Sequence, residues 1–221
     1  MSKNKKSSSM AKQKQRVREI QKILKAQYPD VKTQLTHKTP FQLLVATILS
    51  AQCTDRQVNA VTEKLFKNLK TAGDFSEADL PTLEDLVRPT GFYKNKAANI
   101  KNCARRIVER FDGRVPDNIE ELVSLPGVGR KTANVVLGAA FGIPGMVVDT
   151  HVARISGRLG LTKNKNPEKI EADLMAIIPK KDWNDFSLRL IFFGRQFCKA
   201  RKPDCENCPL KHLCCAEIKK V

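Results

Sequence analysis

Residues 125–140, LPGVGRKTANVVLGAA, combine a glycine-rich turn with the start of a helix. Gly127 and Gly129 flank Val128, and the apolar residues that follow recur at helical spacing: Ala133, Val136, Leu137 and Ala140. Glycine tolerates a positive φ and lets the backbone approach a ligand closely. The first N–H groups of a helix have no internal partner and carry the positive end of its dipole. The stretch therefore predicts a turn and a helix N-terminus that can bind a phosphate.

The glycine pattern excludes the common nucleotide-binding loops. A Walker loop requires GxxxxGK(S/T), but Arg130 separates Gly129 from Lys131, and Thr132 takes the place of the third glycine in GxGxxG. We therefore expect no nucleotide cofactor. Two interpretations stay open from these residues alone: a phosphate-binding hairpin, or a glycine-rich helix start in a packed helical domain.

Signals for helix starts recur along the whole chain, and no alternating apolar run bounded by turns indicates a strand. Residues 11–27 are expected to form a first helix, and Pro40 opens a second whose apolar residues make one stripe. Further N-caps are predicted at Thr54 or Asp55, at Asp117 with Glu120 in a capping-box pattern, and at Asn166 before Pro167. The sequence thus predicts an all-α fold.

A second turn, at residues 91–93, repeats part of the hairpin pattern. Aligning Gly91 with Gly127 superimposes GFYKNKAANI on GVGRKTANVV, which predicts a second, degenerate helix-turn-helix pair without the second glycine. Phe92 and Tyr93 are expected to be exposed at its tip. An aromatic residue there can stack on or wedge between bases, and the alternative is a buried staple residue at the helix start.

The chain of 221 residues carries a formal net charge of +17, which requires an anionic partner or a solubilising tail. Residues 1–18 contribute seven positive charges and no acid, so +10 remains on the body. A basic body favours nucleic acid as a partner, and scattered solvated lysines are the alternative. The tail has no apolar core of secretory length, and Gly142 and Pro144 interrupt the apolar run at residues 135–148. We therefore expect no membrane association and a cytoplasmic location.

The most specific chemical signal lies near the C-terminus. Of the seven cysteines, four follow the spacing C-x6-C-x2-C-x5-C within 17 residues: Cys198, Cys205, Cys208 and Cys214. In a reducing compartment such crowding indicates metal binding rather than disulfides, and unrelated structural thiols are the alternative. Zinc and an iron–sulfur cluster both accept four thiolates, although the single C-x2-C pair favours the cluster. The basic residues around them, Lys199 and Arg201 among them, are expected to hold a DNA backbone.

Four separated motifs together resemble one family. The hairpin LPGVGRKTA, the segment VDTHV at residues 148–152, the segment LSAQCTD at residues 49–55 and the cysteine spacing are similar to the endonuclease III family of helix-hairpin-helix DNA glycosylases. The resemblance implies a bilobed all-α fold, with a six-helix barrel lobe over residues 33–142 and a basic flexible tail over residues 1–14. Residues 15–32 and 143–221 would form the second lobe around a 4Fe–4S cluster. Damaged double-stranded DNA would lie between the lobes of a monomer.

By this resemblance Lys131 is the nucleophile and Asp149 its carboxylate partner. An amine must be unprotonated to attack C1′ of a deoxyribose, and a helix N-terminus in a dry pocket disfavours the charged form of a lysine. A carboxylate can move protons and stabilise the oxocarbenium-like charge that develops as the base departs. From the residues alone, Asp149 has a second interpretation as the N-cap of a helix that starts at Thr150, and the two roles can coexist.

The resemblance also implies which residues contact DNA. Removal of a nucleotide from the stack leaves a gap, which Gln52 is expected to fill, and Phe92 stands where relatives often carry an aliphatic wedge. The remaining contacts are expected from the hairpin and the cysteine-rich loop: Gly127, Val128, Gly129, Arg130, Lys199 and Arg201.

The implied activity is that of a bifunctional DNA glycosylase and abasic-site (AP) lyase in base excision repair. It would remove oxidised pyrimidines from duplex DNA through a lysine Schiff base and cut 3′ to the abasic site by β-elimination. Adenine-specific relatives lack the lysine nucleophile and carry VDGN in place of VDTH, so Lys131 and Thr150 argue against that activity. A non-catalytic DNA-binding or redox-sensing iron–sulfur protein is the other alternative, and it would need neither Lys131 nor Asp149.

Overall fold

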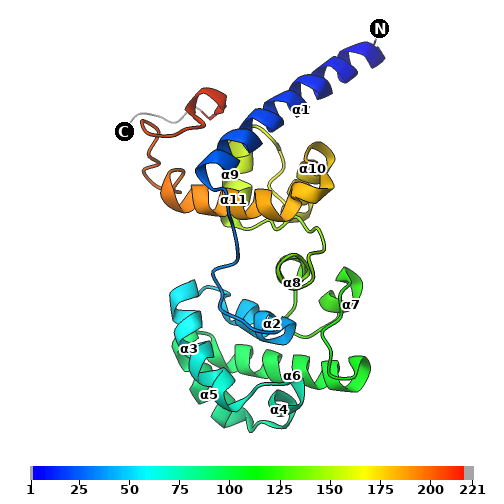
Figure 1. Ribbon diagram of the computed structural model, residues 1–221, viewed down its shortest axis with the longest axis vertical. Coiled ribbons are helices and arrows are strands. Elements are labelled where there is room, and N and C mark those ends of the chain that lie inside the picture. The colour runs from blue at the N-terminus through cyan, green and yellow to red at the C-terminus, as the bar shows by residue number, and fades with distance from the viewer. Residues whose placement is uncertain (1, 217–221) are drawn as a thin grey trace. The chain divides into compact units, whose positions relative to one another are not determined.

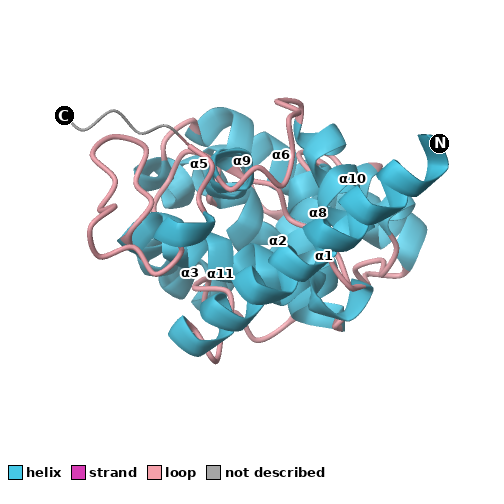
Figure 2. Ribbon diagram, turned by 90° about the horizontal axis from the view of Figure 1, so that it is seen from above, coloured by secondary structure: helices cyan, strands magenta, loops and turns pink. Residues whose placement is uncertain are grey.

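The computed structural model describes the backbone of residues 2–216 and the side chains of residues 13–216. Every regular element in this range is a helix, as the sequence predicts, and no strand occurs among the described residues (Figure 2). The chain divides into two compact units (Figure 1). The central unit comprises Thr33–Ile143, and the terminal unit comprises the chain up to Lys32 and from Pro144 onward. Within the described range, no helix has the length and apolar character that a membrane span requires.

The central unit contains the helices α2 to α8 and the short 3-10 helix η1. Their bounds are Pro40–Leu49 for α2, Asp55–Asn68 for α3, Ala72–Glu77 for α4, Leu80–Val87 for α5, Arg88–Thr90 for η1, Tyr93–Phe111 for α6, Ile119–Val123 for α7 and Arg130–Phe141 for α8. Helix α6 packs against α4 and α5, while α2 packs against α3, α6 and α8. Helix α2 therefore lies at the centre of this unit.

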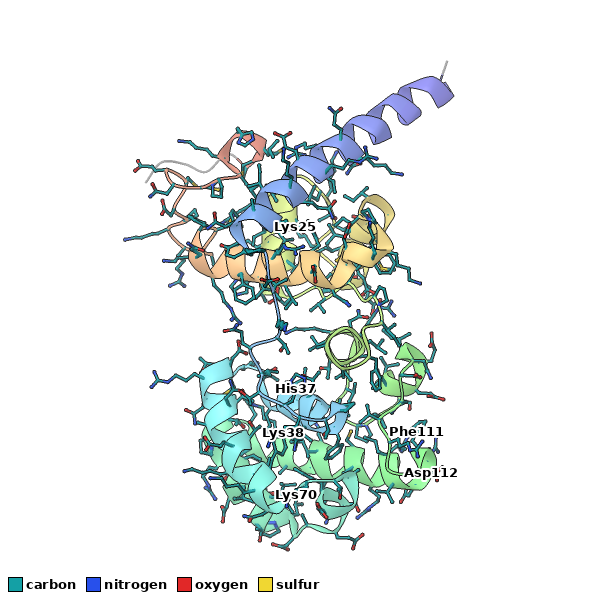
Figure 3. The ribbon with its side chains drawn as sticks, in the orientation of Figure 1. Lys25, His37, Lys38, Lys70, Phe111 and Asp112 are labelled. Carbon is teal, nitrogen blue, oxygen red and sulfur yellow. The ribbon has the colours of Figure 1, made fainter. Side chains whose placement is uncertain are left out.

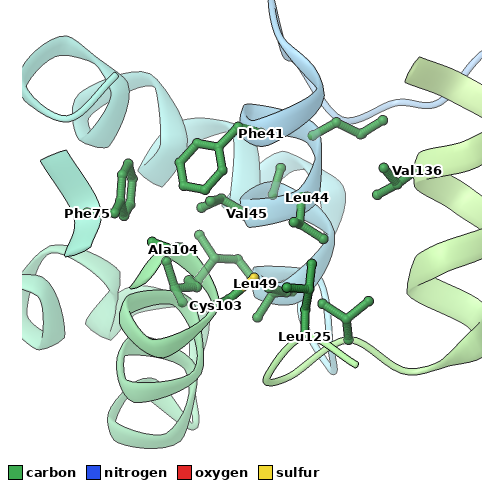
Figure 4. Close-up of a cluster of buried hydrophobic side chains, with 14 of the residues drawn as sticks. Phe41, Leu44, Val45, Leu49, Phe75, Cys103, Ala104, Leu125 and Val136 are labelled. Atoms are coloured by element: carbon green, nitrogen blue, oxygen red, sulfur yellow. The ribbon is translucent and has the colours of Figure 1, made fainter. Parts of the chain in front are cut away.

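Helix α2 is buried on all sides rather than along one stripe. All residues from Phe41 to Leu49 are buried, including the polar Gln42 and Thr47. Figure 4 shows α2 side chains beside residues of α4, α6 and α8, and the ring of Phe41 meets that of Phe75 at 5.3 Å in an edge-on contact. The predicted apolar stripe is buried, and the residues between its members are buried as well. The segment carries no charged residue, so it can be enclosed on every face.

The terminal unit combines segments from both ends of the chain. Its helices are α1 (Ser2–Gln27), α9 (Thr150–Arg158), α10 (Pro167–Ile177) and α11 (Trp183–Gln196), with the short 3-10 helices η2 (Lys180–Asp182) and η3 (Lys211–Leu213). Helix α1 packs on α10 and α11, and it contributes three buried apolar residues: Val17, Ile20 and Leu24. Arg189 of α11 donates to the Tyr28 carbonyl at 3.0 Å and so fixes the chain just after α1.

Helix α1 begins earlier than the sequence predicts. A tail over residues 1–14 and a helix from Ala11 are expected, whereas α1 starts at Ser2. Residues 2–27 contain neither glycine nor proline, and most of them are lysine, glutamine, alanine or other residues that a helix accepts. No residue in this range therefore terminates the helix, and its end at Gln27 agrees with the prediction.

Two predicted N-caps are confirmed. Thr54 Oγ1 accepts a hydrogen bond from the N–H of Gln57 at 3.3 Å at the start of α3. Asn166 Oδ1 accepts one from the N–H of Glu168 at 2.9 Å, and Pro167 takes the first helical position of α10. These caps depend only on neighbouring residues, so the sequence pattern is sufficient to identify them.

The cap predicted for α7 is wrong by one residue. Asn118, not Asp117, has the extended backbone of an N-cap, and its Oδ1 accepts from the N–H of Glu121 at 2.9 Å. Asparagine and aspartate cap helices about equally well, so the local sequence does not choose between them. Packing decides, because a helix that starts at Ile119 places this residue and the fully buried Leu122 against the core.

Candidate functional site

The predicted hairpin joins α7 to α8 through a tight turn. The N–H of Val128 donates to the Leu125 carbonyl at 3.1 Å and closes the turn. Gly127 has a φ of +75°, and a Cβ atom at this position would lie 2.8 Å from Asn99 Cβ on α6. Both the backbone conformation and the close approach of α6 therefore require glycine at position 127.

Gly129 is a glycine for a different reason. Its φ of −89° and ψ of 172° are accessible to any residue, so the positive φ expected of hairpin glycines applies to Gly127 and not to Gly129. A Cβ atom at position 129 would have no described atom within 4 Å. The missing side chain leaves open space directly before α8, where a ligand can approach the backbone.

Helix α8 starts without a side-chain cap. Gly129 is the N-cap residue, its carbonyl accepts from the N–H of Ala133 at 3.0 Å, and no described side chain caps this helix end. By contrast, α2, α3, α7 and α9 each begin with a capping side chain. The start of α8 thus carries the positive end of a helix dipole with no side-chain cap among the described residues, an arrangement that suits a phosphate.

The hairpin residues differ in what they present to solvent. Val128 is 6% exposed, and its N–H is used within the turn, so it supports the turn rather than facing a ligand. Gly127, Gly129, Arg130 and Lys131 are exposed. Val128 therefore has a structural role in the turn.

Lys131 is the second residue of α8 and is exposed to solvent. The opposite face of the helix, which includes Ala133, Val136 and Leu137, packs in the core of the central unit. Within the central unit, Lys131 therefore lies on the solvent-facing side of α8.

Asp149 is the N-cap of α9. Its Oδ1 accepts a hydrogen bond from the N–H of Val152 at 2.8 Å, and the residue is half-buried. The capping interpretation is confirmed, with α9 beginning at Thr150. Asp149 belongs to the terminal unit, whereas Lys131 belongs to the central unit.

His151 lies on the first turn of α9, two residues after Asp149. Burial lowers the pKa of His151, the Asp149 carboxylate raises it, and the guanidinium groups of Arg154 and Arg195 lower it further. The side chain of Arg154 lies 3.1 Å from His151 Nδ1. Gly194 of α11 permits this packing, because a Cβ atom there would lie 2.6 Å from His151 Nδ1.

The four predicted cysteine ligands lie on the loop that follows α11. Each is half-buried: Cys198, Cys205, Cys208 and Cys214. Burial raises the pKa of the Cys208 thiol, and the other three thiols raise it further, so each of them lies within electrostatic reach of Cys208. Yet no three His, Cys, Asp or Glu side chains within residues 13–216 are placed to hold a metal ion. As a donor set, four neighbouring thiols accept either zinc or an iron–sulfur cluster.

Two arginines on one face of α9 hold the start of this loop. Arg154 Nη2 donates to the Cys198 carbonyl at 2.8 Å. Arg158 Nη1 lies 3.2 Å from Cys198 Sγ and donates to the Lys199 carbonyl at 2.9 Å. Neither arginine is among the site residues expected from the sequence. Their spacing of four residues, which puts them on the same helix face, is the one signal that could have found them.

Basic side chains occur on both units. Lys199 and Arg201 are exposed on the cysteine-rich loop. Figure 3 shows further exposed lysines: Lys25 on α1, Lys38 before α2 and Lys70 before α4. The charge of the body is therefore distributed rather than confined to one segment.

Two exposed loop tips of the central unit have unusual backbone. Gln52, between α2 and α3, has a φ of 53°, and Phe92, between η1 and α6, has a φ of 48°. Residues other than glycine seldom adopt this left-handed conformation, and they do so mostly where surrounding structure imposes it. Phe92 is 64% exposed, so it is not a buried staple residue. Tyr93 is not exposed as expected, since it packs on the core with Arg88 4.7 Å from its ring.

Comparison with known proteins identifies the family. Residues 45–180 match the family model of the HhH-GPD superfamily of base excision DNA repair proteins, and residues 198–214 match the iron–sulfur binding domain of endonuclease III. The endonuclease III of Synechocystis sp. is 56% identical over 206 residues, which cover 93% of this chain and 94% of that protein. The chain belongs to the endonuclease III family. The iron–sulfur interpretation of the cysteine spacing is thereby confirmed over zinc.

Solved structures of endonuclease III have the same fold. A non-covalent complex of endonuclease III with DNA gives a TM-score of 0.88 at 46% identity, over 91% of this chain and 94% of that chain. A trapped covalent intermediate of endonuclease III with DNA, an estranged-adenine complex, gives a TM-score of 0.88 at 46% identity over 91% of this chain and 95% of that chain. These matches confirm the predicted all-α fold of the endonuclease III family.

Proposed function

We propose that this protein is a bifunctional DNA glycosylase and AP lyase that removes oxidised pyrimidines from damaged double-stranded DNA in base excision repair. The observation that carries the proposal is the exposed amine of Lys131 on the first turn of an uncapped helix. A phosphate bound at this helix end would place the adjoining sugar within reach of the amine. The trapped covalent DNA intermediate of a relative 46% identical supports a reaction through a covalent bond between protein and DNA.

Lys131 supplies the nucleophile in the proposed reaction. Its unprotonated Nζ bonds to C1′ while the bond from C1′ to the base breaks, and the base departs with that electron pair and a proton. The sugar ring then opens, O4′ takes a proton, and a Schiff base joins Nζ to C1′. Loss of the acidified C2′ proton expels the 3′ phosphate, so the strand is cut on the 3′ side of the lesion.

Bound DNA completes the environment of this amine. Lys131 is exposed in the free protein, so the DNA itself must displace water from it. Desolvation and the positive end of the α8 dipole both disfavour the charged form of an amine. The attack on C1′ would therefore take place in the complex, from which water is displaced.

Asp149 supplies the carboxylate. Its hydrogen bond to the N–H of Val152 fixes the side chain at the start of α9. A carboxylate held in this way can move protons and stabilise the positive charge that develops at C1′. Asp149 would act in the transition state rather than in substrate binding.

Two sets of residues would hold the DNA. Gly127, Gly129, Arg130, Lys199 and Arg201 are exposed and would contact phosphates. The exposed tips Gln52 and Phe92 would enter the duplex, with Gln52 filling the gap left by the extruded nucleotide and Phe92 acting as a wedge.

The four cysteines would hold a 4Fe–4S cluster: Cys198, Cys205, Cys208 and Cys214. When bound, the cluster supplies a rigid crosslink between four thiolates rather than a step of the reaction. The chain's own residues then orient the loop, since Arg154 and Arg158 bind its first carbonyls. The loop presents Lys199 and Arg201 to DNA in a fixed conformation.

We also propose that the protein acts as a monomer in the cytoplasm, associated with DNA. The lobes would correspond to the two units, with a barrel lobe over residues 33–142 and a cluster lobe over residues 15–32 and 143–221. The two compact units of the chain support this division.

Borohydride trapping tests the proposal. Duplexes with thymine glycol, an abasic site or no damage are incubated with the protein and the hydride donor, which reduces a Schiff base to a stable adduct. The wild type should form the adduct on both damaged duplexes, and Lys131→Ala should form none while still binding them. Lys94→Ala is the matched control, because Lys94 is the exposed second residue of α6, whose start also has no capping side chain among the described residues.

The other outcomes of this experiment are equally informative. Base release without an adduct would indicate a water nucleophile activated by Asp149 and a monofunctional enzyme. Binding without base release or strand cutting would favour the non-catalytic iron–sulfur protein and overturn the proposal.

A further inference from the structure

Lys96 is a buried lysine that the proposed reaction does not use. It is the fourth residue of α6 and is 5% exposed. Its Nζ donates to the Leu49 carbonyl at 2.9 Å and to the Thr90 carbonyl at 2.7 Å. Burial of an amine is costly unless its hydrogen bonds are made, and these two bonds satisfy that requirement.

The two carbonyls belong to the bases of two different loops. Leu49 is the last residue of α2, and the loop that follows carries Gln52. Thr90 is the last residue of η1, and the loop that follows carries Phe92. One amine therefore joins the starting points of both loops.

Lys96 also holds the second loop through its backbone. Its N–H donates to the Phe92 carbonyl at 3.1 Å. Phe92 and Gln52 both have a positive φ, which persists only where the surrounding structure imposes it. The side chain of Lys96 therefore binds the bases of the two loops, while its N–H binds the backbone of Phe92 and leaves the Phe92 ring exposed.

We propose that Lys96 is a positioning residue that holds Gln52 and Phe92 at a fixed spacing, so that both side chains enter the duplex together. This inference rests on the proposed function, in which these residues fill and wedge the DNA. Two independent loops would each lose conformational freedom on binding, whereas loops already joined lose less. The joined loops present one preorganised pair of tips to the base stack.

A purely space-filling role does not explain an amine at this position. Methionine would fill the same volume without the cost of removing an amine from water. That cost is evident in this structure, because burial lowers the pKa of Lys96. The amine is instead aimed at two carbonyls that come from separate segments.

Lys101 provides a matched comparison on the same helix. It also donates from Nζ to a backbone carbonyl, that of Ala78 just after α4. Neither the loop of Gln52 nor that of Phe92 contains this carbonyl. Loss of the Lys101 bond should therefore affect stability without a selective effect on DNA distortion.

The test compares Lys96→Met with Lys101→Met on two substrates. One is a thymine glycol duplex, whose excision requires base extrusion. The other is a single-stranded oligonucleotide with an abasic site, whose borohydride trapping requires the amine of Lys131 but no duplex distortion. Lys96→Met should lose about tenfold or more in excision from the duplex, while trapping on the single strand changes less than about twofold. Lys101→Met should change both by the same factor.

A spectroscopic signal reports the insertion directly. 2-Aminopurine placed opposite the lesion becomes more fluorescent when the base stack opens. The fluorescence rise on binding wild-type protein should be largely lost with Lys96→Met and kept with Lys101→Met, with all proteins at saturation. Lys96→Gln, which retains shorter N–H donors, should restore part of the rise.

A double-mutant cycle separates positioning from general stability. In a Gln52→Ala/Phe92→Ala background, Lys96→Met should have little further effect on duplex excision, since no tips are left to position. The inference would be overturned if Lys96→Met had an undiminished effect in that background, or if it caused equal losses on both substrates. Thermal unfolding of each variant shows whether it folds. If Lys96→Met does not fold, Lys96→Gln replaces it in the cycle. A wild type that forms no adduct on either substrate would instead refute the proposed function.

Discussion

Asp149 Oδ1 accepts a hydrogen bond from the backbone N–H of Val152 at 2.8 Å. The carboxylate that we assign to the reaction therefore also caps α9. The two roles can be separated, because asparagine caps a helix about as well as aspartate but carries no charge.

We expect Asp149→Asn to unfold with a free energy within about 0.5 kcal/mol of the wild type and to bind damaged DNA, because the cap is retained. Its single-turnover excision should slow about 100-fold, since the charge in the transition state is lost. Asp149→Ala is the control and should lose about 1 kcal/mol of stability as well. Urea unfolding and single-turnover kinetics measure these effects. Excision by Asp149→Asn at the wild-type rate would leave Asp149 as a cap alone.

The two hairpin glycines should respond differently to alanine. Gly127→Ala forces a side chain into a φ of +75° and to within 2.8 Å of Asn99, so we expect a loss of about 1–3 kcal/mol in stability. Gly129→Ala meets no described atom within 4 Å, and its stability should stay within about 1 kcal/mol of the wild type. Its DNA affinity should nevertheless fall, because the methyl group occupies the approach to α8. Urea unfolding measures the stability of the two variants, and anisotropy titrations measure their DNA affinity. An unchanged DNA affinity of Gly129→Ala would contradict the phosphate site.

DNA affinity should depend on salt through the exposed basic residues. Lys199→Gln and Arg201→Gln are each expected to reduce the slope of log affinity against log salt by about 1, if each residue contacts one phosphate. Lys67→Gln is the control, because Lys67 lies exposed on α3, 3.8 Å from Glu63. Fluorescence anisotropy over a salt series measures the slopes. Wild-type slopes in both loop variants would remove the cysteine-rich loop from the DNA contact.

Replacement of one cluster ligand should affect DNA binding through the loop. Cys205→Ser should lower the iron and sulfide content of the protein and its visible absorbance. It should also weaken DNA binding more than it slows borohydride trapping at saturating DNA, because Lys131 lies in the other unit. Cys103→Ser is the control, since Cys103 lies in the core of the central unit, outside the loops of Gln52 and Phe92. Metal analysis and visible spectroscopy report the cluster. Stoichiometric zinc without iron in the wild type would refute the 4Fe–4S assignment.

Much of the local structure could be predicted from the sequence alone. The caps at Thr54, Asp149 and Asn166 involve donors only two or three residues further along the chain. The hairpin turn is expected from Gly127 and Gly129, and the iron–sulfur binding segment over residues 198–214 is expected from the cysteine spacing. Each of these features depends on chemistry within a short segment, so the sequence carries the complete signal.

The tertiary structure alone decided burial and the contacts between distant segments. Phe92 and Tyr93 are neighbours in sequence, yet Phe92 is 64% exposed while Tyr93 packs on the core. Lys96 reaches the Leu49 carbonyl across 47 positions, and Arg158 reaches the Lys199 carbonyl across 41 positions. Such contacts have no local signature, because they arise when the apolar faces of separate helices pack together and bring their polar groups within bonding distance.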